Sequence, residues 1–398
     1  MDVLFEKFQQ RLVWVDTRFV RSLMDEINWN ARLIGIKGPR GVGKTTLLLQ
    51  YIKLHLNNEL ETSLYASLDN IWFNHHKLSD LVDEFVKKGG KYLFLDEVHR
   101  YPDWSQELKN IYDDYPGLHV VFTGSSLLQI LNARADLSRR ATVYNMQGLS
   151  FREYLNLATG SALPVFPTDQ ILHNHLDLAR QITLVVKPLQ HFSTYLRSGY
   201  YPFFIDLPEL YFTRLEEVVN MVLDIELPLL RGLETAYIPK IRQLLQIIAE
   251  SAPFVPNISK LSERIGINRT TLLSYLFYLN ESQLIRTLYK DASGITRLQK
   301  PDKLFLDNTN LIYAFSPQSV NTGNLRETFF ANQLKYRQMV EYAEQGDFRV
   351  AGTHTFEIGG KNKSSRQLPK VGNSWIAADD IEYGHGNKIP LWLFGFLY

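Results

Sequence analysis

Cysteine is absent from the 398 residues of the sequence. Its absence excludes disulfide bonds, thiolate metal ligands and cysteine nucleophiles, and it agrees with a reducing cytoplasm. Long hydrophobic runs are absent as well, since residues 389–398 reach about half of the roughly 18 to 20 apolar residues that a membrane span needs. The first residues carry both charge signs and lack the apolar core of a signal peptide. We therefore expect a cytoplasmic protein with no membrane contact.

An excess of charge of one sign is also lacking. The chain has 43 basic and 42 acidic side chains and a formal net charge of +1. No whole-molecule field therefore attracts phosphate, and any contact with nucleic acid needs a local basic patch. Apolar residues make up 45% and charged residues 21% of the chain, which is typical of a folded globular protein. The length predicts about two to four domains.

Residues 1–155 alternate short apolar runs with helical patterns. The runs lie at residues 32–37, 63–67, 92–95 and 119–123. They lack the polar alternation of half-exposed strands, and each is followed by Gly, Asp or Ser where a loop must begin. This rhythm predicts an α/β domain with a parallel sheet covered by helices.

One segment satisfies the phosphate-binding pattern G-x-x-x-x-G-K-[ST], between the strand expected at residues 33–37 and the helix expected at residues 46–54. Glycines let the backbone curl so that N–H groups face an anion at the positive end of the following helix. We therefore predict an ATP site of the P-loop NTPase type. Its residues are Gly38, Pro39, Arg40, Gly41, Val42, Gly43, Lys44, Thr45 and Thr46.

Four side chains near this loop have predicted chemical roles. Lys44 would neutralise the β- and γ-phosphate oxygens, and Thr45 would place its hydroxyl on Mg²⁺. The strand at residues 92–95 ends in Asp96 and Glu97. We predict that Asp96 accepts waters of the Mg²⁺ shell and that Glu97 polarises the attacking water. The alternative for Glu97 is a helix N-cap.

The next apolar run ends in hydroxyl side chains. Thr123 or Ser125 would sense the γ-phosphate or the attacking water by hydrogen bonding. Capping of the next helix by Ser125 or Ser126 is the alternative. His99, beside the carboxylate pair, is expected to be a surface or cap residue without a catalytic role.

These segments together resemble a known family. The resemblance rests on GPRGVGKTT, YLFLDEVHR, VVFTGSS and LSRRATVYNMQGLSFREYL, and later on YLRSGYYPFF, KPDKLFLDNTNLIYAF, NLRETFFANQL and IPLWLFGFLY. It covers most of the chain. The family is that of the AAA-type ATPases of bacteria and archaea that carry a C-terminal winged-helix and nuclease-like region. The resemblance implies magnesium-dependent ATP hydrolysis.

The resemblance also implies a catalytic arginine. This sequence has Arg139 where the family usually has glycine, and Arg140 matches the family's arginine. An arginine there can stabilise charge on the transferring phosphoryl group, in its own subunit or across a homo-oligomer. The alternative is a salt bridge from Arg140 to Glu153 or Asp136.

Two further segments precede the C-terminal region. Residues 156–240 are mainly helical and aromatic, which predicts a helical lid or connector. Residues 241–299 contain a helix, a turn at Gly266 and a second helix capped by Asn268, in the order of a helix-turn-helix. A wing formed by residues 283–289 and 295–298 would complete a winged helix.

Two kinds of partner fit residues 259–290. DNA binding would place Asn268, Arg269, Thr270 and Ser274 in the major groove, with Lys260, Arg286 and Lys290 near phosphates. The basic density is modest, and winged helices in ATPases also dock proteins. The choice between DNA and a protein partner stays open.

Residues 300–398 resemble a restriction-endonuclease-like α/β domain. Glu327 is expected in a helix, and Asp347 and Glu357 in strands. Such nucleases hold Mg²⁺ with carboxylates and use a lysine two residues after the glutamate. Glycine stands at that position here, and Lys361 is displaced by two residues. We therefore expect a degenerate fold kept for packing or binding.

The preferred interpretation is a nucleotide-driven switch, in which Mg-ATP hydrolysis repositions the winged helix and the C-terminal region. A docking module that holds ATP with little turnover is one alternative. An ATP-controlled nuclease is the other.

Overall fold

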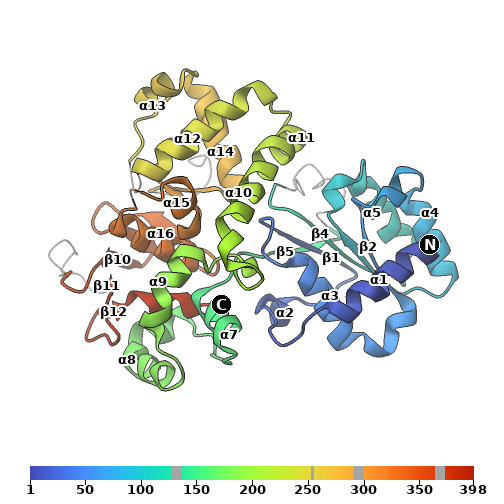
Figure 1. Cartoon of the computed structure of the whole chain (residues 1–398), viewed down its shortest axis with the longest axis horizontal. Helices are drawn as coiled ribbons and strands as arrows, with labels where there is room; N and C mark the ends of the chain where they lie inside the picture. Colours follow the sequence, from blue (N-terminus) through green and yellow to red (C-terminus); the bar gives the residue numbers. More distant parts are fainter. Residues whose placement is uncertain (128–136, 138, 252–254, 291–299, 319, 364–372) are drawn as a thin grey trace. The chain divides into compact units, whose positions relative to one another are not determined.

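The computed structural model describes residues 1–127, 137, 139–251, 255–290, 300–318, 320–363 and 373–398 (Figure 1). The chain divides into two compact units, Met1–Gln147 and Gly148–Tyr398. The finer division into four domains stays a prediction. Within the described residues, every helix is too short or too polar to cross a membrane.

The first unit is built on a five-stranded parallel sheet in the order β2-β3-β4-β1-β5. Its strands are β1 (Leu33–Gly38), β2 (Ser63–Ser67), β3 (Tyr92–Asp96), β4 (His119–Ser125) and β5 (Thr142–Asn145). The α-helices are α1 (Asp2–Trp14), α2 (Leu23–Glu26), α3 (Lys44–His55), α4 (Leu78–Lys87) and α5 (Trp104–Asp114), and the 3₁₀ turns are η1 (Asn57–Thr62), η2 (Ile71–Asn74) and η3 (Val98–Arg100). The predicted α/β fold is confirmed.

The four apolar runs of the sequence are the strands β1 to β4. Ile34, Leu93 and Phe122 on these strands are fully buried, because helices cover both faces of the sheet. In register, Ser67 at the end of β2 lies opposite Asp96 at the end of β3. All five strands are parallel, so their carboxyl ends share one edge of the sheet, where ligands of open α/β sheets bind.

The second unit is mainly helical. Its α-helices are α7 (Phe151–Thr159), α8 (Thr168–Val185), α9 (Pro188–Ser198), α10 (Tyr211–Met221), α11 (Leu227–Arg231), α12 (Ile238–Ser251), α13 (Ile258–Ile265), α14 (Arg269–Glu281), α15 (Thr309–Phe315) and α16 (Thr322–Leu334). A π-helical turn, η6 (Val222–Glu226), joins α10 to α11. The 3₁₀ turns are η4 (Pro202–Phe204), η5 (Pro208–Leu210), η7 (Thr235–Tyr237) and η10 (Leu391–Phe396).

Two sheets complete this unit. Strands β6 (Ile285–Leu288) and β7 (Lys303–Leu306) pair antiparallel. A five-stranded mixed sheet has the order β12-β11-β10-β9-β8. Its strands are β8 (Val340–Tyr342), β9 (Phe348–Val350), β10 (His354–Gly359), β11 (Ser374–Ala378) and β12 (Lys388–Pro390).

Within the second unit, the start of helix α7 is hydrogen-bonded to the C-terminal residue, Tyr398. A capping box between Ser150 and Glu153 begins α7. The Ser150 hydroxyl donates to the Tyr398 carbonyl oxygen at 2.6 Å, and the Arg152 Nε donates to the same oxygen at 2.8 Å. All of these side chains are buried, so the LSFRE segment is part of the core of the second unit.

Candidate functional site

The loop between β1 and α3 has backbone conformations that require glycine. Gly41 and Gly43 have φ of 80° and 97°, in the left-handed region that glycine adopts without strain. A Cβ atom on Gly38 would lie 2.0 Å from the Met146 carbonyl oxygen. The loop opens directly onto the N-terminus of α3, where backbone N–H groups and the helix dipole favour an anion.

Two buried cations hold this loop. The Lys44 ammonium donates to the carbonyl oxygens of Gly38 at 2.9 Å and Pro39 at 2.8 Å. The Arg21 guanidinium donates to the carbonyl oxygen of Val42 at 2.6 Å. Lys44 was predicted from its motif, whereas Arg21 has no sequence signal because it precedes the loop by a stretch without a recognised pattern. Both side chains keep positive charge inside the loop.

Asp96 is held by three hydroxyl groups. Its Oδ2 accepts from Thr45 Oγ1 at 2.6 Å and from the Tyr65 hydroxyl at 2.7 Å, and its Oδ1 accepts from Thr123 Oγ1. Asp96 is 2% exposed and Tyr65 is 3% exposed. The structure therefore brings together the predicted residues Thr45, Asp96 and Thr123. Tyr65 is an additional member that the sequence did not reveal.

Thr45 and Asp96 could hold Mg²⁺. Their oxygens lie 2.6 Å apart, and hydroxyl and carboxylate oxygens are the donors that Mg²⁺ prefers, with waters filling its remaining positions. Across the described residues, no group of three or more His, Cys, Asp or Glu side chains could hold a metal by itself. The residues present thus fit a metal shared with a phosphate ligand rather than an all-protein site.

Glu97 is partly buried next to basic groups. Its Oε2 lies 3.3 Å from His99 Nε2 and 3.9 Å from an Arg40 guanidinium nitrogen. Burial raises the pKa of Glu97, an effect that the charge of Lys44 opposes. Although Glu97 precedes η3, its side chain makes no capping hydrogen bond there, so the N-cap alternative has no support. The backbone at Glu97 is left-handed with φ of 55°, a conformation that costs energy in a non-glycine residue.

Thr123 joins the two carboxylate residues. Its hydroxyl donates to Asp96 and accepts from the Glu97 backbone N–H at 3.2 Å. The Ser125 hydroxyl instead accepts from the Leu127 N–H at 3.3 Å, as a local cap would. Of the two predicted sensors, Thr123 therefore has the more suitable position.

His99 is not at the surface, so that expectation was wrong. It is 5% exposed, and its Nδ1 accepts from the Ser125 N–H at 3.4 Å. His99 lies in the short turn η3 that follows Glu97, and its ring lies between Glu97 and the end of β4. His99 is therefore a buried neighbour of the Glu97 carboxylate.

Arg140 forms a salt bridge with a residue that the sequence did not indicate. Its Nε donates to Asp113 Oδ1 and one of its terminal nitrogens to Oδ2, each at 2.8 Å. Of the two expected partners, Asp136 lies outside the described residues, and Glu153 caps α7. The neighbouring Ser138 of the family motif also lies outside them.

The predicted helix-turn-helix has its expected local structure. Gly266 ends α13 with φ of 69°, and the Asn268 side chain accepts from the Thr271 N–H at 2.8 Å at the start of α14. Strands β6 and β7 follow as a hairpin. The second predicted wing segment, residues 295–298, lies outside the described residues.

Two of the predicted phosphate contacts differ from expectation. Arg286 is 2% exposed and forms a salt bridge of 2.7 Å with the equally buried Asp307, so it was wrongly predicted to contact DNA. Lys290 is exposed and pairs with Glu344 at 2.5 Å. A recess of about 370 Å³ beside α13 is lined by Arg269 and Lys300, which supply basic groups at the surface.

The C-terminal carboxylates are paired with lysines. Lys303 Nζ lies 2.6 Å from Glu327 and 3.8 Å from Asp347, and Lys363 Nζ lies 2.5 Å from Glu357. Asp347 immediately precedes β9 instead of lying within a strand. Lys361, the displaced lysine of the sequence pattern, is exposed and lies 3.6 Å from Asp380. Lys363, rather than Lys361, is thus the lysine beside Glu357.

Comparisons with known protein sequences found a matching family and a similar protein. Residues 30–155 match the model of the AAA domain family. The chain is 28% identical over 289 residues to Uncharacterized protein MJ1637 of Methanocaldococcus jannaschii. That match covers 70% of this chain and 61% of the relative, so the chain spans less than two thirds of the relative's length.

Two solved structures resemble the chain only distantly. The Aeropyrum pernix ORC1 protein in complex with DNA is 14% identical, with 79% of this chain and 92% of that chain covered and a TM-score of 0.33. AMPPCP-bound DnaA from Aquifex aeolicus is 13% identical, with 67% and 93% covered and a TM-score of 0.30. The parallel sheet and the loop before α3 give the first unit the α/β fold of a P-loop NTPase, and most of this unit lies within the segment that matches the AAA domain family.

Proposed function

We propose that this protein binds Mg-ATP in the loop at residues 38–45, hydrolyses it, and uses the nucleotide state to switch its second unit. One observation carries the proposal: Thr45, Asp96, Thr123 and Glu97 form a continuous hydrogen-bonded series at the carboxyl edge of the sheet. This series lies beside the N-terminus of α3, where phosphate binds in P-loop proteins.

The loop residues would bind and orient the triphosphate. Backbone N–H groups of the loop donate to phosphate oxygens, and Lys44 adds a positive charge that is already buried. Thr45 and Asp96 would hold Mg²⁺. When bound, Mg²⁺ offsets the negative charge that develops on the phosphoryl oxygens.

Glu97 would accept hydrogen bonds from the attacking water and orient it. Its burial raises its pKa, which makes the carboxylate a stronger base than an exposed glutamate. His99 and Arg40 lie beside one of its oxygens and fix its direction. Thr123 links this base to Asp96, so that a change at the metal site reaches Glu97 through one side chain.

The second unit would respond to the nucleotide state of the first unit. Its helix-turn-helix and hairpin fit a winged helix that docks either DNA or a protein. Burial of Arg286 removes one of the phosphate contacts expected for DNA, whereas Arg269 and Lys300 remain near the surface. An ATPase rate that rises with added duplex DNA would assign DNA as the partner, and an unchanged rate would favour a protein.

The C-terminal carboxylates support packing rather than nuclease chemistry. The ammonium groups of Lys303 and Lys363 already balance Glu327 and Glu357 at 2.6 Å and 2.5 Å. A divalent cation would have to compete with both lysines. We infer that this region holds the fold together and does not cleave nucleic acid.

Replacement of the base tests hydrolysis. Glu97→Gln is expected to lower the ATP turnover number by about 10² to 10⁴, the usual contribution of a general base, while the dissociation constant of ATP changes little. Turnover is measured by phosphate release and affinity by equilibrium binding. Glu61→Gln, an exposed glutamate of the same unit, is the matched control. Undiminished turnover in Glu97→Gln would remove Glu97 from the mechanism, and the protein would then be an ATP-holding docking module.

A further inference from the structure

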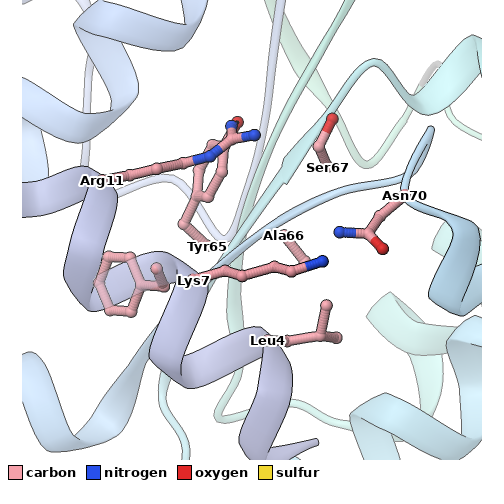
Figure 2. Close-up of a pocket in the computed structure, with 8 residues that line it drawn as sticks. Leu4, Lys7, Arg11, Tyr65, Ala66, Ser67 and Asn70 are labelled. Atoms are coloured by element: carbon pink, nitrogen blue, oxygen red, sulfur yellow. Dashed lines mark hydrogen bonds between the residues drawn. The ribbon is translucent and has the colours of Figure 1, made fainter.

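Two side chains, Arg11 of α1 and Tyr65 of β2, connect helix α1 to Asp96 at the candidate metal site. An Arg11 guanidinium nitrogen donates to the Tyr65 hydroxyl oxygen at 2.9 Å, and that hydroxyl donates to Asp96 Oδ2 at 2.7 Å. Figure 2 shows Arg11 extending from α1 over the Tyr65 ring. We propose that Tyr65 is a positioning residue for Asp96, and that Arg11 makes the geometry of Asp96 depend on the docking of α1. The proposal rests on the proposed binding of Mg-ATP.

A phenol suits this position because it orients a carboxylate without neutralising it. A direct arginine contact would form an ion pair and reduce the charge that Asp96 offers to a cation. Tyr65 instead places a neutral donor on Asp96 and keeps the guanidinium one residue away. Hydrogen bonds in such a chain polarise one another, so Arg11 strengthens the donation from Tyr65.

Tyr65 also differs from the other donors to Asp96. Thr45 is itself a predicted metal ligand, and Thr123 is shared with the Glu97 backbone. Tyr65 is the donor on Oδ2 that holds Asp96 whether or not the Thr45 oxygen is engaged elsewhere. Asp96 and Tyr65 are both buried, so loss of this bond removes a donor from a carboxylate that is shielded from bulk water.

Arg11 links α1 to Asp96 because its guanidinium bonds Tyr65, which in turn donates to Asp96. The helix packs against β2 and α3, and Leu4 and Phe8 are its buried side chains. The space beside Arg11 is a cavity of about 20 Å³ that Lys7, Ser67 and Asn70 also line (Figure 2). This volume has room for about one water and excludes an organic ligand, so Arg11 serves its contact with Tyr65 rather than a second ligand site.

Nucleotide binding with and without Mg²⁺ tests the proposal. The dissociation constant of a fluorescent ATP analogue is measured in EDTA and in Mg²⁺ for the wild type, Tyr65→Phe, Arg11→Ala and the double variant, each after circular dichroism shows a folded chain. Tyr65→Phe should keep the affinity in EDTA and lose about 3- to 10-fold of the gain given by Mg²⁺, as expected for one buried hydrogen bond. Tyr92→Phe, at the opposite end of β3, should match the wild type.

Arg11→Ala should produce a smaller loss in the same direction, and the double variant should resemble Tyr65→Phe because Arg11 acts through Tyr65. In each variant, the ATP turnover number should decrease together with the increase in affinity that Mg²⁺ gives. A wild type without Mg²⁺-dependent binding would overturn the proposed function itself. A wild type that gains affinity from Mg²⁺, beside a Tyr65→Phe variant with the same gain, would overturn only the role of Tyr65. Independent, additive losses from Arg11→Ala and Tyr65→Phe would overturn the relay through α1.

Discussion

At the scale of single residues, Gly38 shows how closely the phosphate loop is packed. A methyl group there would meet the Met146 carbonyl oxygen at 2.0 Å, and backbone atoms cannot yield as a flexible side chain can. Gly38→Ala should therefore lower the free energy of unfolding by about 1 to 3 kcal/mol, the usual cost of overpacking, and weaken ATP binding. Chemical denaturation measures the change. Gly117→Ala, which has open space around the added methyl, should be neutral, and equal stability of the two variants would contradict the packing.

Residues that belong to a motif or end an apolar run could be predicted from the sequence, including Thr123 on β4, whereas a partner in the middle of a strand could not. Lys44 and Thr45 follow from one motif, and Asp96 from the end of an apolar run. Tyr65 looks like an ordinary buried aromatic of a strand. Its hydroxyl reaches Asp96 because β2 pairs directly with β3, and this neighbourhood depends on strand order that the motif does not encode. His99 was misassigned for the same reason, since its burial depends on β4.

At the scale of elements, the β6–β7 hairpin depends on a buried ion pair. Arg286 on β6 and Asp307 just after β7 are each 3% exposed in their side chains. Arg286→Met should cost about 3 to 5 kcal/mol of unfolding free energy, because it leaves Asp307 charged and buried. Lys290→Met breaks an exposed pair with Glu344 and should cost about 0 to 1 kcal/mol. A loss in Arg286→Met no larger than that of the lysine variant, measured by denaturation, would contradict the structure.

The sequence predicted the first strand of this hairpin within residues 283–289 but placed the second at residues 295–298, whereas the strand that pairs with β6 is Lys303–Leu306. The pattern also did not indicate which way the basic residues face. Arg286 lies between Ile285 and Thr287 in a short strand, where charge alone suggested exposure. Its partner, Asp307, is distant in the sequence, and no motif sets the spacing between the two residues. The helix-turn-helix was predicted more fully, because Asn268 and Gly266 are local signals for the start and end of helices.

Helix α16 carries a pH-dependent group. Burial raises the pKa of Glu327 above its usual value of 4.5, against the opposing charge of Lys303, and Asp347 adds to the rise. The folded state therefore holds this proton more tightly than the unfolded state, and stability falls as pH rises through the interval above 4.5. As the pH rises through that interval, the unfolding free energy of the wild type should fall relative to that of Glu327→Gln. At higher pH the difference between the two should stay constant. Denaturation curves at a series of pH values measure this, and a relative gain with rising pH would contradict it.

At the scale of the whole molecule, the chain joins a unit with the P-loop NTPase fold to a second unit with its own core. The first unit could be predicted in outline because its fold follows from local apolar runs and one motif. In the second unit the sequence predicted local elements such as the helix-turn-helix but not their assembly, since α7 and Tyr398 lie at opposite ends of the unit in the sequence and yet share a buried hydrogen-bonded cluster. A net charge of +1 gives no long-range field, so any response to nucleotide must pass through specific contacts.

The central claim is that a triphosphate occupies the loop before Lys44. The most direct measurement is titration of a fluorescent ATP analogue, in the presence of Mg²⁺, into the wild type, Lys44→Ala and the surface control Lys88→Ala. We predict saturable binding by the wild type and the control, and binding weaker by about 10-fold or more in Lys44→Ala, since a buried cation that bonds phosphate is lost. A wild type without affinity, or a Lys44→Ala variant that binds as tightly as the wild type, would contradict the claim.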